Sequence, residues 1–129
     1  MLSQTGIYAI RAMSYIASQQ EDEKPLLSRT IAEEMQIPVN FLSKILNRLA
    51  QAGLIRSIRG RNGGFVMTRP KSEICVREVV DLFMQLGDHK DCLLGLKKCD
   101  GSCGLHHRWS NITEQFDMML DETTIDKVK

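Results

Sequence analysis

The fold of this protein is decided by residues 26–70, which read LLSRTIAEEMQIPVNFLSKILNRLAQAGLIRSIRGRNGGFVMTRP. Apolar residues recur every three or four positions over about 29–35 and again over about 38–51, with a short turn at Gln36-Ile37-Pro38 between them. Ser28 is a suitable N-cap for the first helix, and the proline suits the start of the second. Two short helices joined by a tight turn, the second amphipathic, indicate a helix-turn-helix.

A β-hairpin is predicted directly after the second helix. Gly53 ends that helix, and Leu54–Arg59 alternates between apolar and polar residues as a strand does. Arg61-Asn62-Gly63-Gly64 reads as a turn, and Phe65–Met67 reads as the returning strand. A helix-turn-helix followed by a hairpin is a winged helix. The sequence therefore predicts a mainly α fold with a small β-hairpin wing, and a protein that binds double-stranded DNA.

Further helices are predicted on both sides of this unit. Residues 5–19 and residues 73–86 each carry an apolar face at helical spacing. Residues 87–104 are rich in glycine and cysteine and show no sustained period, so we expect a loop there. The expected organisation has three parts: a winged helix-turn-helix DNA-binding domain over 1–86, a cysteine-rich sensor loop over 87–104, and a dimerisation helix with its tail over 105–129.

A heptad stripe marks the last helix and predicts that it packs along a partner helix. In so small a protein we expect the partner to be the same helix of a second subunit, since a symmetric dimer suits a palindromic DNA site. The alternative is that the stripe packs on its own domain. The stripe, at spacings of 4, 3, 4 and 3, is formed by Leu105, Trp109, Ile112, Phe116 and Met119.

Basic residues gather in the middle of the chain, although the net charge of the 129 residues is only +1. Between Glu34 and Glu73 there are seven basic residues and no acidic one. Such a stretch is typical of a surface that faces phosphates, although acidic partners from elsewhere in the chain are an alternative. The seven are Lys44, Arg48, Arg56, Arg59, Arg61, Arg69 and Lys71.

Neither a membrane span nor a signal peptide is visible in the sequence. No run of about 18 apolar residues exists, and Arg11 falls where the apolar part of a signal peptide would lie. We therefore expect a cytoplasmic protein with no membrane partner. No nucleophile–base set or phosphate-binding glycine motif appears outside the cysteine loop, so we do not expect an enzyme.

The outer face of the second helix of the motif is predicted to enter the major groove of DNA. Asn40 can bind an adenine edge, and Ser43 can serve either base type. Lys44 and Arg48, further along the helix, are placed to reach phosphates. Two arginines flank the wing tip, where arginine can enter a narrow minor groove. The predicted DNA-binding residues are Ser28, Arg29, Asn40, Phe41, Ser43, Lys44, Arg48, Arg59 and Arg61.

Three of the four cysteines lie in the glycine-rich loop. They read Cys92-x6-Cys99-x3-Cys103, and His106 follows three residues after the last of them. Three thiolates and an imidazole within fifteen residues can surround a soft metal or an iron–sulfur cluster. Without a Cys-x2-Cys pair the spacing leaves four readings open: an iron–sulfur cluster, zinc, redox-reactive thiols, or no special role.

Other ligand-type side chains lie nearby in the sequence. His89 and His107 are alternatives to His106 as a ligand, although each is more often a surface histidine. Cys75 lies between two apolar residues at the start of a predicted helix, so we expect a buried structural thiol there.

Several stretches match a pattern that is known from one family. They are Gly6–Met13 (GIYAIRAM), Ile37–Leu42 (IPVNFL), Gly53–Ile55, Arg59–Phe65 (RGRNGGF), and the set Cys92, Cys99, Cys103, His106 and Trp109. Together they resemble the IscR/NsrR type of winged-helix regulators, the Rrf-two family, over essentially the whole chain.

The resemblance implies a homodimer joined through the long C-terminal helix. It also implies a 2Fe–2S or 4Fe–4S cluster on three cysteines and one other residue, or no cluster, and a response to iron–sulfur status, nitric oxide, iron or redox state. By position, the thiolate ligands would be Cys92, Cys99 and Cys103, and His106 falls at the histidine that completes a 2Fe–2S site. Arg59 would be the wing arginine. The base-reading face would be Asn40, Phe41 and Ser43.

The chain departs from the family pattern at three points. Its cysteine gaps are six and three residues, whereas cluster-binding relatives space them about five apart on both sides. Ser43 stands where cluster-assembly regulators have a glutamate that discriminates among DNA sites. Ile7 and Tyr8 stand where nitric-oxide sensors have an acidic fourth ligand, which favours His106 and a 2Fe–2S cluster over a 4Fe–4S cluster.

These observations lead to one working hypothesis and two rivals. We expect gain, loss or oxidation of the cluster to reposition the loop and the fourth helix against the DNA-binding unit. One rival is a regulator of the same fold that uses zinc or direct thiol oxidation with no cluster. The other is a small iron–sulfur redox carrier, which would not explain the wing or the basic stretch.

Overall fold

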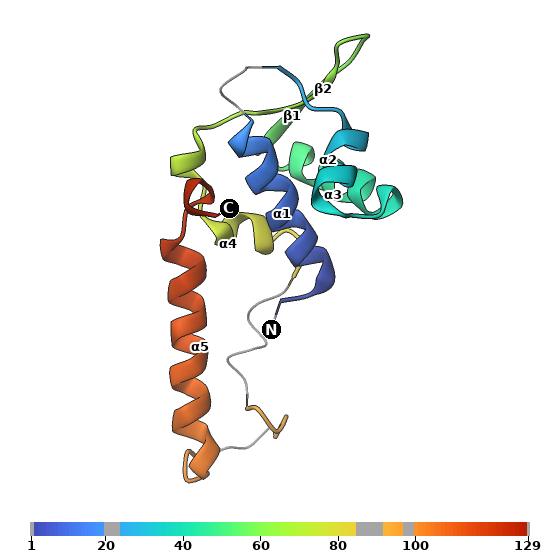
Figure 1. Cartoon of the computed structure of the whole chain (residues 1–129). Helices are drawn as coiled ribbons and strands as arrows, with labels where there is room; N and C mark the ends of the chain where they lie inside the picture. Colours follow the sequence, from blue (N-terminus) through green and yellow to red (C-terminus); the bar gives the residue numbers. More distant parts are fainter. Residues whose placement is uncertain (1, 20–23, 85–91, 97–99, 129) are drawn as a thin grey trace.

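Helix α1 (Gln4–Ser18) runs through the centre of the structure, and the other elements of the winged unit pack around it (Figure 1). The computed structural model describes residues 2–19, 24–84, 92–96 and 100–128. The helix begins where the Ser3 hydroxyl accepts a hydrogen bond from the Gly6 N–H (3.1 Å). Its buried face is made of small and apolar side chains, so neighbouring helices approach it closely. That face includes Ala9, Ala12, Met13, Ile16 and Ala17.

The helix-turn-helix is present where the sequence predicts it. Helix α2 (Ser28–Met35) is followed by Gln36 with a φ of 54°, a left-handed conformation that turns the chain sharply into α3 (Val39–Gln51). One face of α3 is buried in the core and the opposite face is exposed. The buried residues of α3 are Leu42, Ile45, Leu46 and Leu49.

The start of α2 differs from the prediction. Ser28 is the first helical residue rather than the N-cap, and no side chain caps the helix at Leu27. The reason is that Leu26 pairs with Phe65 of the hairpin, with N–H···O distances of 2.9 Å in both directions. That pairing holds the chain extended up to Leu27 and so moves the cap position back by one residue.

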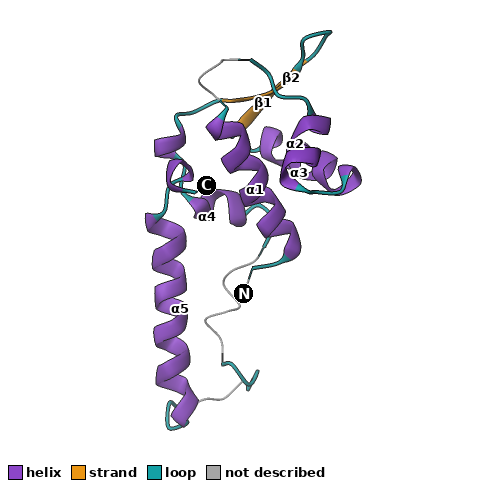
Figure 2. Ribbon diagram, viewed as in Figure 1, coloured by secondary structure: helices purple, strands orange, loops and turns teal. Residues whose placement is uncertain are grey.

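The wing is a two-stranded antiparallel hairpin of β1 (Ile55–Ile58) and β2 (Gly64–Met67) (Figure 2). Ile55 pairs with Met67, and Ile58 with Gly64. Gly64 has a φ of 149°, and a Cβ there would overlap the backbone of Leu26. The position therefore requires glycine. These elements confirm the predicted winged helix.

The predicted helix over 73–86 is wrong in length. The structure has a 3-10 turn, η2 (Lys71–Glu73), and then a five-residue helix, α4 (Val76–Val80). Between them the chain is extended because it pairs with the C-terminal segment: Ile125 N–H donates to the Ile74 carbonyl, and Val76 N–H to the Thr123 carbonyl, both at 2.8 Å. Cys75 lies in this pairing and is half-buried, so the expectation of a fully buried thiol is also wrong.

Helix α5 (Gly104–Glu122) extends well away from the winged unit (Figures 1 and 2). Its C-terminal part joins the core through buried Leu120 and half-buried Phe116, and Ile125 in the short turn η4 (Ile125–Lys127) is buried there as well. No helix in the described ranges is both long and apolar enough to cross a membrane.

The buried face of α3 should dominate the stability of the winged unit. Leu42 is 0% exposed, so Leu42→Ala should lower the free energy of unfolding by about 2–5 kcal/mol. Leu27→Ala removes the same atoms from a side chain that is 56% exposed, and should leave stability within about 0.5 kcal/mol of wild type. Urea unfolding of the two variants measures the difference, and equal losses would contradict the assigned packing of α3.

Candidate functional site

The outer face of α3 presents a row of exposed polar and basic side chains. It forms because the apolar residues of α3 occupy the opposite face, which is buried. The Ser43 hydroxyl donates to the Val39 carbonyl one turn back (3.1 Å), which leaves its oxygen facing outward as an acceptor. The exposed row consists of Asn40, Ser43, Lys44, Asn47 and Arg48.

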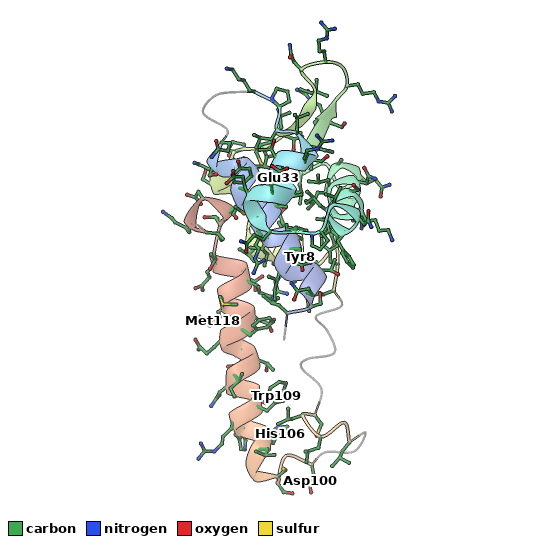
Figure 3. All side chains as sticks on the ribbon, turned by 45° about the vertical axis from the view of Figure 1, so that its right-hand side comes forward. Tyr8, Glu33, Asp100, His106, Trp109 and Met118 are labelled. Atoms are coloured by element: carbon green, nitrogen blue, oxygen red, sulfur yellow. The ribbon has the colours of Figure 1, made fainter. Side chains whose placement is uncertain are left out.

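Phe41, in the first turn of α3, has a different environment from this row. Its ring is 56% exposed but packs on Tyr8 of α1, with ring centroids 6.4 Å apart and an interplanar angle of 50°. The Arg11 guanidinium lies 5.8 Å from the centroid of the Tyr8 ring, within the range of a cation–π contact. Phe41 therefore joins the beginning of α3 to α1. Tyr8 is labelled on α1 in Figure 3.

The wing carries two exposed arginines on either side of its tip. Arg59 follows β1, Gly60 turns the chain with a φ of 112°, and Arg61 comes next. A hollow of about 480 Å³ lies between this turn and the segment before α2, and Lys24 contributes to its lining together with Arg61. Sequence reasoning missed Lys24, because only the pairing of Leu26 with the hairpin brings its segment to the wing.

The predicted start of α2 is only partly accessible. Ser28 is half-buried in the first turn, whereas Arg29 is exposed. Both lie one or two residues after Leu27, which lines the hollow beside the wing. The predicted residues of α2, α3 and the wing therefore belong to neighbouring surface elements of the winged unit.

An ion pair joins the end of the wing to α4. Arg69 donates to both Glu78 carboxylate oxygens (2.9 and 3.5 Å) and to the Glu73 carbonyl (2.8 Å). Glu78 also accepts from the Cys75 N–H (3.1 Å) and so caps the first turn of α4. The hydrogen bond from Arg69 is the main reason that the pKa of Glu78 is lowered. This pair links the end of the wing to the first turn of α4.

Two predicted metal ligands, Cys103 and His106, lie at the N-terminal end of α5. Figure 3 shows His106 at this end, away from the winged unit. Cys103 is the N-cap of α5 and is exposed, and the His106 N–H donates to the Cys103 carbonyl (3.0 Å). Cys92 is half-buried in the preceding segment. Cys99 and His89 lie outside the described residues. Cys75, the residue before α4, belongs to the winged unit rather than to this end of the molecule.

The side chains at this end fit an iron–sulfur cluster in their chemistry. Thiolate sulfur and imidazole nitrogen are the ligand atoms that such clusters use, and Cys103 and His106 share one helical turn. Among the described residues no three His, Cys, Asp or Glu side chains converge on one point. The types of side chain therefore suit a cluster. Cys99, which would be the third thiolate ligand, lies outside the part of the chain that the structure describes.

The predicted stripe on α5 is largely uncovered. Leu105, Ile112 and Met119 are 44%, 51% and 49% exposed, whereas Trp109 and Phe116 are half-buried. The only buried residues of α5 are Thr113 and Leu120. Most of the stripe is therefore exposed within this chain, although half-buried Phe116 packs against the core of the winged unit.

A winged helix-turn-helix with an exposed polar and basic second helix defines a DNA-binding transcription regulator. Residues 2–129 match the Rrf2 family of iron-dependent transcriptional regulators, and the chain belongs to this family. The family and its members are described as transcriptional regulators and not as enzymes, which agrees with the expectation from the sequence that this protein is not an enzyme.

Individual relatives agree with this assignment. The regulator IscR of Serratia proteamaculans is 30% identical over 126 residues, which cover 96% of this chain and 76% of that protein. The solved structure of T. potens IscR is similar with a TM-score of 0.75 at 25% identity, over 97% of this chain and 82% of that one. CymR, the global cysteine regulator of B. subtilis, shares the fold with a TM-score of 0.79 at 23% identity, over 99% and 95%.

The Arg69–Glu78 pair should make stability depend on pH. Because the pKa of Glu78 is lowered in the folded state, its contribution is present above the unfolded pKa of about 4.3 and is lost as pH falls through the folded value. Glu78→Gln should therefore destabilise the protein at pH 7, by less than about 1 kcal/mol since both side chains are partly in water. The gap from wild type should close near pH 3. Glu33→Gln, at an exposed site on α2, is the control for loss of one carboxylate; a gap that persists at low pH would contradict the pair's role.

Proposed function

We propose that this protein is a homodimeric transcription regulator that binds a palindromic operator through α3 and the wing, and that senses its signal through the cysteine loop. One observation carries the DNA-binding part of the proposal. The exposed polar and basic face of α3 lies next to a wing with two exposed arginines, and α5 leaves the winged unit on another side (Figure 1). The proposed parts are a DNA-binding domain over 1–86, a sensor loop over 87–104 and a dimerisation helix with its tail over 105–129.

In the proposed complex, α3 lies in the major groove. Asn40, in the first turn, meets base edges, and the outward oxygen of Ser43 accepts from a base donor. Lys44 and Arg48 lie one and two turns further along α3 and bind phosphates, which fixes the position of the helix. The remaining contacts follow from the neighbouring elements. Ser28 and Arg29 on α2 contact the backbone, Phe41 borders the bases, and Arg59 and Arg61 enter the minor groove.

Dimerisation is proposed to cover the stripe on α5. Burying exposed large apolar side chains against a partner lowers the free energy, and a heptad stripe can pack along the same stripe on a second helix. A two-fold dimer presents two recognition helices to two equivalent half-sites. This arrangement supports a palindromic operator.

The sensor is proposed to be an iron–sulfur cluster, of the 2Fe–2S type, held by Cys92, Cys99, Cys103 and His106. When bound, such a cluster supplies one-electron redox chemistry. The chain connects this end of the molecule to the DNA-binding unit through Met84, the last described residue before the loop. Its sulfur accepts a hydrogen bond from the Ser3 N–H (3.2 Å) at the start of α1. A change at the cluster is proposed to act through this contact on α1, the helix that supports α3.

The DNA-binding proposal predicts that one variant loses sequence discrimination and that another loses affinity for all DNA sequences. With an operator selected from random DNA by the wild-type protein, Asn40→Ala should reduce discrimination at one base position by about 1–3 kcal/mol. Lys44→Gln should weaken binding to all sequences and reduce the slope of log affinity against log salt by about one. Lys127→Gln, an exposed lysine on η4 outside the proposed surface, is the control and should change neither. Equal behaviour of Lys44→Gln and Lys127→Gln would refute the assigned face.

The sensor proposal predicts the colour of protein prepared without oxygen. Iron and sulfide should accompany absorption bands at roughly 400 nm and above, and Cys92→Ser, Cys99→Ser and Cys103→Ser should each abolish them. Cys75→Ser, at the N-cap of α4, is the matched control and should keep them. A colourless protein with stoichiometric zinc would favour the zinc alternative, and a colourless protein without metal would favour direct thiol oxidation. Either result would reject the cluster while leaving the DNA-binding proposal intact.

A further inference from the structure

Helices α4 and α5 are joined by a single guanidinium that binds two carboxylates. Arg77 of α4 donates through Nη2 to Asp117 (2.9 Å to Oδ1 and 3.3 Å to the carbonyl) and, through Nε and Nη2, to the Asp121 carboxylate. Asp117 and Asp121 lie four residues apart, and so on one face of α5. Asp81 of the winged unit lies 3.9 Å from the same guanidinium. The Arg77 side chain is 24% exposed and that of Asp117 is 16% exposed, so the contact is shielded from water.

The end of α5 is attached to the core without this ion pair. Leu120 and Ile125 are each 1% exposed, and the chain after α5 forms backbone hydrogen bonds with Ile74 and Val76. These contacts, together with half-buried Phe116 packed against the core, hold the C-terminal part of the helix. A helix that is held at one end only remains able to tilt about that end. Arg77 holds α5 at Asp117, about 9 Å further up the axis than Thr123, and so supplies a second point of attachment.

The direction of α5 matters because the helix is long. From Asp117 to Leu105 it runs for about 18 Å beyond the ion pair. A tilt of about 10° would displace the far end of such an arm by about 3 Å, close to the 3.4 Å rise of one base pair. If the two α5 helices of a dimer hold each other, the same tilt moves the winged units instead. The distance between the two recognition helices then changes by a comparable amount.

We propose that Arg77 is a positioning residue for operator recognition: by binding Asp117 and Asp121 it fixes the tilt of α5 on the winged unit and thereby sets the half-site spacing that the dimer accepts. This inference rests on the proposed dimer and its operator, and adds to them a residue that determines specificity without touching DNA. The planar guanidinium suits the role, because its fork of donors binds both carboxylates in a fixed orientation.

The test measures the spacing preference of the full chain. An operator is first selected with the wild-type protein from random DNA, and its two half-sites are then moved apart and together one base pair at a time. The variants are Arg77→Gln and the double variant Asp117→Asn with Asp121→Asn. Glu114→Gln with Glu122→Gln is the matched control, since it removes two exposed carboxylates from the same helix. Circular dichroism and sedimentation measure folding and dimer formation for each protein.

We expect wild type and control to prefer one spacing over its neighbours by about tenfold or more, since misplacing one recognition helix costs as much as a mismatched base pair. In Arg77→Gln and in the double Asp→Asn variant, the ratio of the affinity for the preferred spacing to the affinity for its neighbours should fall toward one. The affinity for a single half-site and the dissociation constant of the dimer should stay unchanged. Loss of the preference in these variants but not in the control supports the proposal.

An unchanged spacing profile in folded, dimeric variants would overturn it, as would an equal loss in the control. If Arg77→Gln fails to fold, the double Asp→Asn variant decides, because it leaves Leu120 and Ile125 buried. A wild-type protein that sediments as a monomer, or that selects no operator, overturns the proposed function itself. That failure is recognised before any variant is made.

Discussion

The close packing of other helices on α1 is the constraint on which the rest of the structure depends. Ala9 and Ala12 are 0% exposed and leave room for α3 and α4 to approach. At Gly6 an added Cβ would lie 3.0 Å from the Met84 sulfur, so the Met84 side chain would have to shift to admit it. Because α3 packs on α1 through its apolar face, its polar face must point outward. The position of the proposed DNA-binding face of α3 thus follows from the packing of its apolar face in the core.

Charged groups add to the apolar core in joining the wing, α4 and α5. Arg69 connects the end of the wing to α4 through Glu78, and Arg77 connects α4 to α5. The five-residue helix α4 therefore has an ion pair toward the wing and another toward the long helix. A helix of this length has little stability of its own, since nucleation is costly. Its conformation depends on these partners and on the backbone pairing with the C-terminal segment.

Local periodicity predicted the elements whose structure is decided locally. The apolar spacing of α1 and α3, the glycine-rich turn of the wing and the stripe on α5 all correspond to what the structure contains. The errors concern long-range pairing. Ile74 and Cys75 are extended because they pair with Thr124 and its neighbours, about 50 residues later, and Ser28 is displaced from its cap because Leu26 pairs with Phe65. No helical period in a single segment reports such contacts. The same applies to Lys24, which reaches the wing only through that second pairing.

The two ends of the cysteine loop connect to the winged unit over different distances. On the C-terminal side, Cys103 is the N-cap of α5, and about 25 Å of helix lies between it and buried Leu120. On the N-terminal side, Met84 touches Ser3 and Gly6 in the first turn of α1. One turn later, Tyr8 packs on Phe41 at the start of α3. A displacement at Met84 thus acts within two contacts of the exposed face of α3, whereas one that enters through α5 acts on the tilt of that helix against the winged unit. In the dimer proposed above, the first route would change how each half-site is held, and the second would change the distance between the two half-sites.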